Sequence, residues 1–180
     1  LKQQPQTPPV SELKSFKLQT RLSHEMAYLS LFTLGITRYA NSDWDGAIAR
    51  FSDALSQTTE GTSALDRSIV HYFRGNAYRY KNDGDRAIND YSQATKLKPN
   101  FADAYLNRGA VYSSQGNYNR AIDDYNQALK LQPNSDVLYS NRGLAYFYKN
   151  DYRRALTDFN QSIKLQPNVL AYNNRGLVYF

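Results

Sequence analysis

The chain of 180 residues has a formal net charge of +6 and is 41% hydrophobic, which suffices for one domain with a continuous core. It has no cysteine, which excludes disulfides and thiolate metal sites, and its two histidines disfavour zinc, so we expect neither a metal nor a cofactor. No apolar run reaches the length of a membrane-spanning helix, so we expect no membrane span. The sequence starts at Leu1 without a signal peptide, which favours the cytoplasm and leaves a removed signal peptide open.

The N-terminal segment differs in composition from the remainder. Residues 1–10 are rich in proline and glutamine, which predicts an extended linker. The next segment, residues 11–27, contains Leu13, Phe16, Leu18 and Leu22, a weak helical pattern. We expect this segment either to cap the following domain as a separate helix or to continue into its first helix.

From residue 28 onward, one pattern recurs at an almost constant step. Gly75, Gly109 and Gly143 are 34 residues apart. Gly176 follows Gly143 by 33 residues, and Gly35 precedes Gly75 by 40. Small and aromatic residues recur twelve and sixteen positions after each glycine: Ala47, Ala87, Ala121 and Ala155, then Phe51, Tyr91, Tyr125 and Phe159. Spacings of three and four place such residues on one helix face, so the period predicts a stack of similar helical units.

Each unit is predicted to contain two helices. The run from Ser114 to Tyr118 and its equivalents break the helical pattern in the middle of a unit. Gly109 and Ala121 lack bulky side chains, so the two helices can approach closely, and Pro133 ends the second helix. The second unit has Gly84 where the other units have an aromatic residue, so we expect its internal turn to be looser.

This pattern resembles the tetratricopeptide repeat and covers residues 28–180. The resemblance implies an all-α solenoid, a right-handed superhelix of antiparallel helix pairs with about four and a half repeats. The expected units are residues 28–61, 68–101, 102–135 and 136–168, with an incomplete unit at 169–180. Because the fifth unit stops before its second helix, we interpret the sequence as a fragment of a longer chain.

The segment from Asn41 to Gly46 resembles the start of a calcium loop, with oxygen ligands at alternate positions. The twelfth position of such a loop needs a bidentate glutamate, and here it is Ser52. The repeat places Asp43 and Asp45 at the start of a helix, where a carboxylate caps free N–H groups. We therefore expect helix capping rather than calcium.

Arginine and aspartate recur together in three of the units. An arginine directly precedes the repeat glycine, and an aspartate follows that glycine by fifteen residues. The first unit has neither, with Leu34 and Arg50 at these positions. This joint occurrence predicts hydrogen-bonded ion pairs within units: Arg74 with Asp90, Arg108 with Asp124, and Arg142 with Asp158. The alternative is that these arginines bind an anionic ligand.

The resemblance implies a ligand groove lined by first-helix residues at positions two, five, nine, twelve and thirteen of each unit. Candidate groove residues are Phe32, Tyr39, Tyr72, Asn76, Arg79, Tyr80, Leu106, Ser140, Leu144, Phe147, Tyr148 and Asn173. Many are aromatic or aliphatic, and surplus apolar surface on a concave wall favours a partner site over incidental exposure. Asn107, Asn141 and Asn174 directly precede an arginine and are expected to bond a peptide backbone. One subset of the family binds C-terminal carboxylates through a Lys/Asn/Arg clamp, and the inner positions lack its lysine.

The leading hypothesis is a non-enzymatic scaffold that binds a peptide or helix of a partner protein. The alternatives are self-association through exposed terminal helices and a docking or sensor segment of a larger multidomain protein. The pI of about 9.4 raises nucleic-acid binding, but acidic and basic residues are mixed and no RNA-binding signature occurs, which disfavours it. No Ser/His/Asp, Cys/His or phosphate-binding motif is present, so catalysis is the last of the hypotheses.

Overall fold

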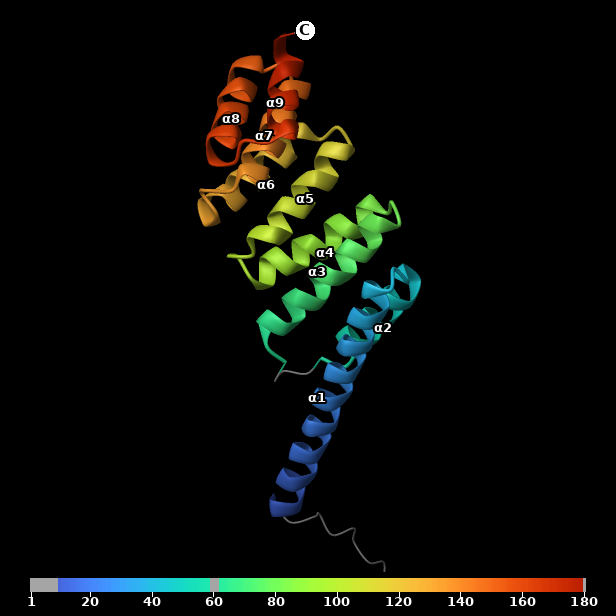
Figure 1. The fold of residues 1–180 in the computed structure, drawn as a ribbon. Helices are drawn as coiled ribbons and strands as arrows, with labels where there is room; N and C mark the ends of the chain where they lie inside the picture. Colours follow the sequence, from blue (N-terminus) through green and yellow to red (C-terminus); the bar gives the residue numbers. More distant parts are fainter. Residues whose placement is uncertain (1–9, 59–61, 180) are drawn as a thin grey trace, which may run out of the picture.

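The computed structural model describes residues 10–58 and 62–179, and every regular element in these ranges is helical. The elements are α1 (Val10–Ala40), α2 (Trp44–Ser56), α3 (Ala64–Tyr80), α4 (Gly84–Leu97), α5 (Ala102–Ser114), α6 (Tyr118–Leu131), α7 (Asp136–Tyr148), α8 (Tyr152–Leu165), α9 (Val169–Gly176) and the 3-10 helix η1 (Leu177–Tyr179). Figure 1 shows them as antiparallel pairs stacked one after another. The prediction of an all-α solenoid is confirmed. In the ranges described, no helix is both long and apolar enough to cross a membrane.

Close helix crossings hold each pair together. A Cβ atom added to Gly109 would lie 2.8 Å from Cε1 of Tyr125 and 3.2 Å from the carbonyl oxygen of Ala121. Gly143 has the same relation to Phe159, whose Cε1 would lie 2.6 Å from such an atom. The aromatic ring of the second helix therefore occupies the space that a side chain on the first helix would need. This contact explains why glycine and a ring recur sixteen residues apart.

A left-handed residue forms the turn inside each complete pair. Ser42, Asn82, Gly116 and Asn150 have φ angles of 58°, 58°, 76° and 60°. In three of the turns the next residue is an aspartate that caps the second helix: Asp43, Asp83 and Asp151 accept hydrogen bonds from backbone N–H groups. The expectation of a looser second turn is wrong, because Gly84 is the first residue of α4 and lies after the turn.

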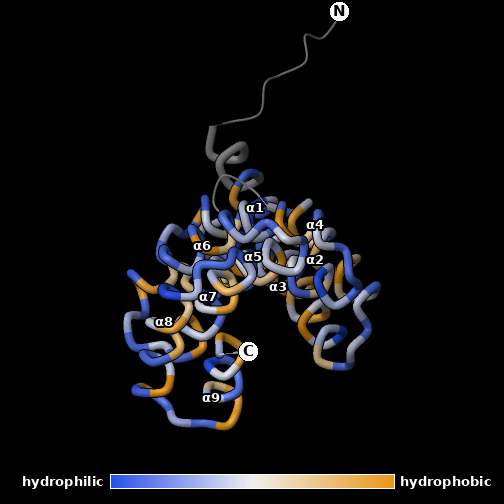
Figure 2. Tube along the Cα trace, turned by 90° about the horizontal axis from the view of Figure 1, so that it is seen from above, coloured by the Kyte–Doolittle hydropathy of each residue, from blue (hydrophilic) through white to orange (hydrophobic). Residues whose placement is uncertain are grey.

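The solenoid is curved, with the first helices of the units on its inner side. Successive first helices contact one another, α1 with α3, α3 with α5, α5 with α7 and α7 with α9, while successive second helices are spread further apart. Seen along the stack, the tube forms an arch (Figure 2). The inner wall of this arch is built from α1, α3, α5, α7 and α9, and we call it the concave groove.

The first helix is longer than its counterparts. α1 is one continuous helix of 31 residues, so residues 11–27 continue into the first helix of the first unit. Its N-terminal part projects away from the stacked pairs (Figure 1). The expected linker at residues 1–10 falls outside the described residues except for Val10, which begins α1.

Candidate protein-interaction groove

The three expected Arg–Asp pairs bridge the two helices of their units. Nε and Nη2 of Arg108 donate to the two carboxylate oxygens of Asp124 over 2.8 and 2.7 Å. Arg142 and Asp158 make the same bidentate contact at 2.7 Å, and Arg74 and Asp90 at 2.8 Å. All three arginine side chains are at most 20% exposed, and their aspartates at most 6%. Hydrogen bonding to Asp158 raises the pKa of Arg142 above its ordinary value, so the pair stays ionised.

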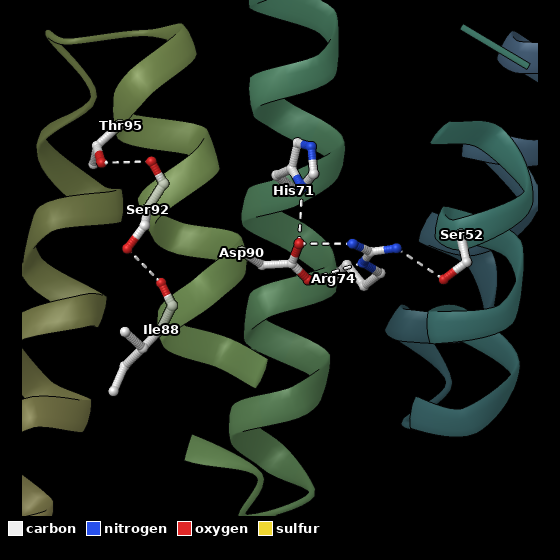
Figure 3. A network of polar contacts seen from close by, with 7 residues as sticks. All are labelled: Ser52, His71, Arg74, Ile88, Asp90, Ser92 and Thr95. Carbon is white, nitrogen blue, oxygen red and sulfur yellow. Dashed lines mark hydrogen bonds and ion pairs between the residues drawn. The ribbon is translucent and has the colours of Figure 1, made fainter. Parts of the chain in front are cut away.

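The same arginines also tie each unit to the preceding one. The remaining nitrogen, Nη1, of Arg74 donates to Ser52 over 2.9 Å, as Figure 3 shows. The equivalent bonds run from Arg108 to Ser92, from Arg142 to Asn126 and from Arg175 to Asn160, at 2.7 to 3.0 Å. The row of acceptors was not predicted, although a serine or asparagine recurs seventeen residues after the repeat glycine and could have indicated it. Because the guanidinium N–H groups of these arginines already donate hydrogen bonds within the protein, few of them remain for an anionic ligand.

The second unit modifies this arrangement. In the third and fourth units a tyrosine ring lies under the arginine, with Arg108 5.5 Å from the centroid of Tyr105 and Arg142 5.5 Å from that of Tyr139. In the second unit His71 takes the tyrosine position, and its Nδ1 lies 2.8 Å from Oδ1 of Asp90 (Figure 3). Asp90 is therefore contacted by two side chains of α3.

Several expected groove residues pack between units instead of facing an open groove. Phe32 lies between Phe51 and Phe73, with centroid distances of 6.1 and 6.3 Å. Tyr72 packs on Phe101 at 4.8 Å. Tyr39, Leu106, Leu144 and Phe147 are likewise partly buried against the core clusters. Their apolar surface is covered largely by neighbouring units, because side chains that line the inner wall also fill the joints of the stack.

Two groove tyrosines remain exposed. Tyr80 is stacked on Trp44 with centroids 4.5 Å apart, and Tyr148 is stacked on Tyr118 at 5.5 Å. Each stack joins the start of a second helix to the end of the next first helix. About half of each residue's surface stays accessible, since Tyr80 is 51% and Tyr148 55% exposed.

Hydrogen bonds between polar side chains, several of them buried, link neighbouring units. Nδ2 of Asn107 donates to Asn76 over 2.9 Å and to the hydroxyl of Tyr72 over 3.2 Å. The hydroxyl of Tyr91 donates to the same Asn76 oxygen over 2.6 Å. Farther along, Asn174 donates to Ser140 over 2.9 Å. The side-chain amides of Asn76, Asn107 and Asn174 are therefore engaged in hydrogen bonds within the protein.

Asn141 differs from its counterpart Asn107. The preceding unit offers Leu106 and Ala110 where Asn107 meets Tyr72 and Asn76. No side-chain hydrogen bond of Asn141 occurs within the described ranges, and Asn173 is exposed. The side-chain amide of Asn141 therefore has no hydrogen-bond partner within the described residues, unlike that of Asn107.

The segment from Asn41 to Gly46 forms a helix cap. The carboxylate of Asp43 accepts from the backbone N–H of Gly46 over 2.9 Å and from Arg38 over 3.0 Å. These bonds lower the pKa of Asp43, the Gly46 bond contributing most. Among the residues searched, no group of three or more potential metal ligands comes together.

The sequence and the structure were compared with known proteins. No curated protein matches the sequence. The chain is 26% identical to "First TPR of Spaghetti (RPAP3) bound to HSP90 peptide SRMEEVD", covering 64% of this chain and 92% of that one with a TM-score of 0.62. YrrB, described as "a TPR protein with an unusual peptide-binding site", is 18% identical, covering 92% of this chain and 88% of its own, with a TM-score of 0.74. MamA from Desulfovibrio magneticus RS-1 is 17% identical, covering 84% and 83%, with a TM-score of 0.77. The last two likenesses show the fold.

Family models match the sequence itself. A model described as "TPR repeat" matches residues 75–116, and a model described as "Tetratricopeptide repeat" matches residues 102–135 and 137–169. Together they span more than half of the chain. With the helix pairs, the recurring glycines and the solenoid neighbours, these matches establish that the chain belongs to the tetratricopeptide repeat family.

Proposed function

We propose that the chain is a non-enzymatic protein-interaction scaffold whose concave groove holds a peptide or helical segment of a partner protein. The observation that carries this proposal is a row of side chains on α7. Asn141, Leu144 and Tyr148 are three, four and seven residues apart, so they lie on one face of the helix. Among the described residues the Asn141 amide has no protein partner and the Tyr148 ring is half exposed, which suits a peptide backbone and an apolar side chain; the part of Leu144 that neighbouring units leave accessible lies between them.

The relative with a bound peptide supports the same function. The first TPR of Spaghetti (RPAP3), 26% identical to this chain, carries the HSP90 peptide SRMEEVD in its structure. The lysine of the Lys/Asn/Arg clamp is missing from the inner positions of this chain, so we propose a peptide with another sequence.

Peptide selection tests this function. Random peptides displayed on phage are selected on the immobilised chain, and the enriched peptides are titrated calorimetrically against the wild type and two variants. Asn141→Ala and Tyr148→Ala are expected to weaken binding by about tenfold each, because each removes a contact of about 1.4 kcal/mol.

Two control variants have the same chemistry outside the groove. Asn134→Ala changes an exposed loop asparagine, and Tyr172→Ala changes a tyrosine that is 48% exposed at a position outside the groove set. Both are expected to bind like the wild type. Equal losses in all four variants, or no enriched peptide at all, would contradict a groove on α7.

A second candidate function is self-association through α1. Leu18, Leu22, Met26 and Leu29 are between 51% and 73% exposed and share one face of the helix. We propose that this stripe pairs with a second copy of the chain. Sedimentation at several concentrations of the wild type and of Leu22→Glu tests the pairing. A wild-type chain that stays monomeric at every concentration would contradict self-association through α1.

A further inference from the structure

The junction between the second and third units lacks the aromatic stack found at its neighbours. Trp44 stacks on Tyr80 between the first and second units, and Tyr118 on Tyr148 between the third and fourth. The equivalent positions between the second and third units are Gly84 and Ser114. Both rings are absent at this one joint.

A cavity occupies the place next to these two small residues. It has a volume of about 350 Å³ and is lined by Arg79, Asn82, Gly84, Ala110, Val111, Ser114 and Gln115. Arg79, Ala110 and Ser114 occupy groove positions of α3 and α5, and Asn82 lies in the turn after α3, so the cavity lies at the rim of the concave groove. Its volume is that of a small ligand site.

Arg79 is the charged residue of this cavity, and it lacks the carboxylate partner that other inner arginines have. Arg74, Arg108 and Arg142 are each paired with an aspartate, whereas none of the ion pairs formed by the described residues includes Arg79. The Nε atom of Arg79 is buried and has no hydrogen-bond partner among the described residues. A buried donor without an acceptor is destabilising, so an acceptor that reaches it would bind favourably.

The surroundings of Arg79 hold the guanidinium beside the cavity. It lies over the ring of Tyr80, 5.0 Å from the centroid. The side chain of Arg79 also neighbours the hydroxyl of Tyr91: burial raises the pKa of that hydroxyl, and both the positive charge of Arg79 and a hydrogen bond with its side chain oppose the rise. Rings around the side chain restrict its orientation, which lowers the entropy lost on binding an anion.

The other polar groups of the cavity also provide donors. Gln115 donates one amide N–H to Asp85 over 3.0 Å, which leaves its second N–H. The side-chain amide of Asn82 makes no hydrogen bond within the described part of the chain. The hydroxyl of Ser114 already donates to the carbonyl of Val111 over 2.8 Å. One cation and amide N–H groups around a small space match a carboxylate, which needs planar donors and one positive charge.

We propose that this cavity binds a carboxylate of the partner peptide, with Arg79 as its ion-pair partner. The proposal rests on the peptide-binding function proposed above and gives that function a charge preference. The carboxylate comes from an acidic side chain or from the C-terminus of the peptide, and the two sources are distinguished below. This position, on α3 of the second unit, is separate from the row on α7.

Two small molecules test the cavity without any partner peptide. N-acetyl-glutamate α-amide carries only a side-chain carboxylate, and N-acetylglycine carries only a terminal one; N-acetyl-glutamine α-amide is the neutral control. Each is titrated into the ¹⁵N-labelled chain. The Nε–H signal of Arg79 and the side-chain amide signal of Gln115 are expected to shift with one or both carboxylates and to stay in place with the neutral amide. Equal shifts with all three, or none with any, overturn the proposal even if peptides bind elsewhere in the groove.

Peptides then test the charge preference. A selected peptide with Glu at an enriched position is compared with the same peptide carrying Gln there, and in amidated and free C-terminal forms. For the wild type, neutralising the recognised carboxylate is expected to weaken binding by about tenfold. Arg79→Gln should bind both forms equally.

Arg120→Gln is the matched control, because Arg120 also lies over a tyrosine ring, 5.6 Å from the centroid of Tyr112. It removes the same charge and should keep the preference for the carboxylate. Loss of the preference in both variants would point to net charge alone and refute the site. Loss of all peptide binding in the wild type refutes the proposed function, and the small-molecule titration still decides the cavity.

Discussion

The guanidinium of Arg108 and the carboxylate of Asp124 meet across the two helices of the third unit through hydrogen bonds of 2.8 and 2.7 Å. A third bond, of 3.0 Å, leads from Arg108 to Ser92 in the second unit. One side chain thus holds a helix pair together and attaches it to its neighbour. The first unit has Leu34 and Arg50 at the equivalent positions and still forms its helix pair, so the fold itself does not require the ion pair.

Removing one partner of this pair should lower the free energy of unfolding more than removing both partners. Arg108→Met leaves the carboxylate of Asp124 buried without its counter-charge, which lowers the free energy of unfolding by about 3 to 5 kcal/mol. The double variant Arg108→Met/Asp124→Leu should recover most of that loss. Urea denaturation measures all values, and the exposed Arg120→Met is the control. A single variant no less stable than Arg120→Met would show that the pair contributes little.

Glycine at the helix crossing should be irreplaceable, whereas glycine at the end of α9 should not. Gly109→Ala forces a Cβ against the Tyr125 ring and a backbone oxygen, so we expect a loss of about 1 to 3 kcal/mol in unfolding free energy. Gly176→Ala meets no atom within 4 Å and should be neutral or stabilising by up to about 1 kcal/mol. Thermal unfolding of the two variants gives the comparison. Equal melting temperatures would argue against close packing at Gly109.

Stability should fall at alkaline pH because of buried tyrosines. Burial raises the pKa of Tyr91 and Tyr125 above the ordinary value of 10.0, and burial likewise raises the pKa of Tyr28 to about 12. The folded protein therefore keeps protons that the unfolded chain loses above pH 10, and stability falls as pH rises from there. Below pH 10 the tyrosines are protonated in the folded and the unfolded chain, so their contribution to stability is fully present.

The variant Tyr125→Phe tests this pH dependence. It keeps the ring against Gly109 and removes the titrating hydroxyl, so its stability should decline less steeply above pH 10 than that of the wild type. Urea denaturation from pH 7 to pH 11 measures both slopes. Parallel slopes for the two proteins would exclude Tyr125 as a source of the alkaline loss.

The stack of Tyr80 on Trp44 should be visible in fluorescence. Trp44 is the single tryptophan of the chain, and the Tyr80 ring covers one of its faces. Tyr80→Ser should expose the indole to water and shift its emission to longer wavelength. Tyr148→Ser removes the equivalent ring two units away and should leave the emission unchanged. An unchanged spectrum in both variants would mean that the stack does not persist in solution.

The amino-acid sequence alone determined the helix pairs, their order and their crossing points. Its period repeats local contacts, and Gly109, Ala121 and Tyr125 meet within one pair whatever lies beside it. The Arg–Asp pairs belong to the same class, because both partners come from one unit. Turn residues and caps are equally local, although the sequence misjudged Gly84 by counting it inside the turn.

Only the tertiary structure decided which groove residues are open to a partner. Tyr72 and Tyr148 both occupy groove positions of the repeat, yet one packs on Phe101 and the other is half exposed. The difference lies in what the neighbouring unit offers, as it does for Asn107 and Asn141. Arg79 lacks a counter-charge for the same reason. A repeat pattern specifies each position within its own unit, whereas burial and hydrogen bonding at a joint depend on two units whose residues vary independently.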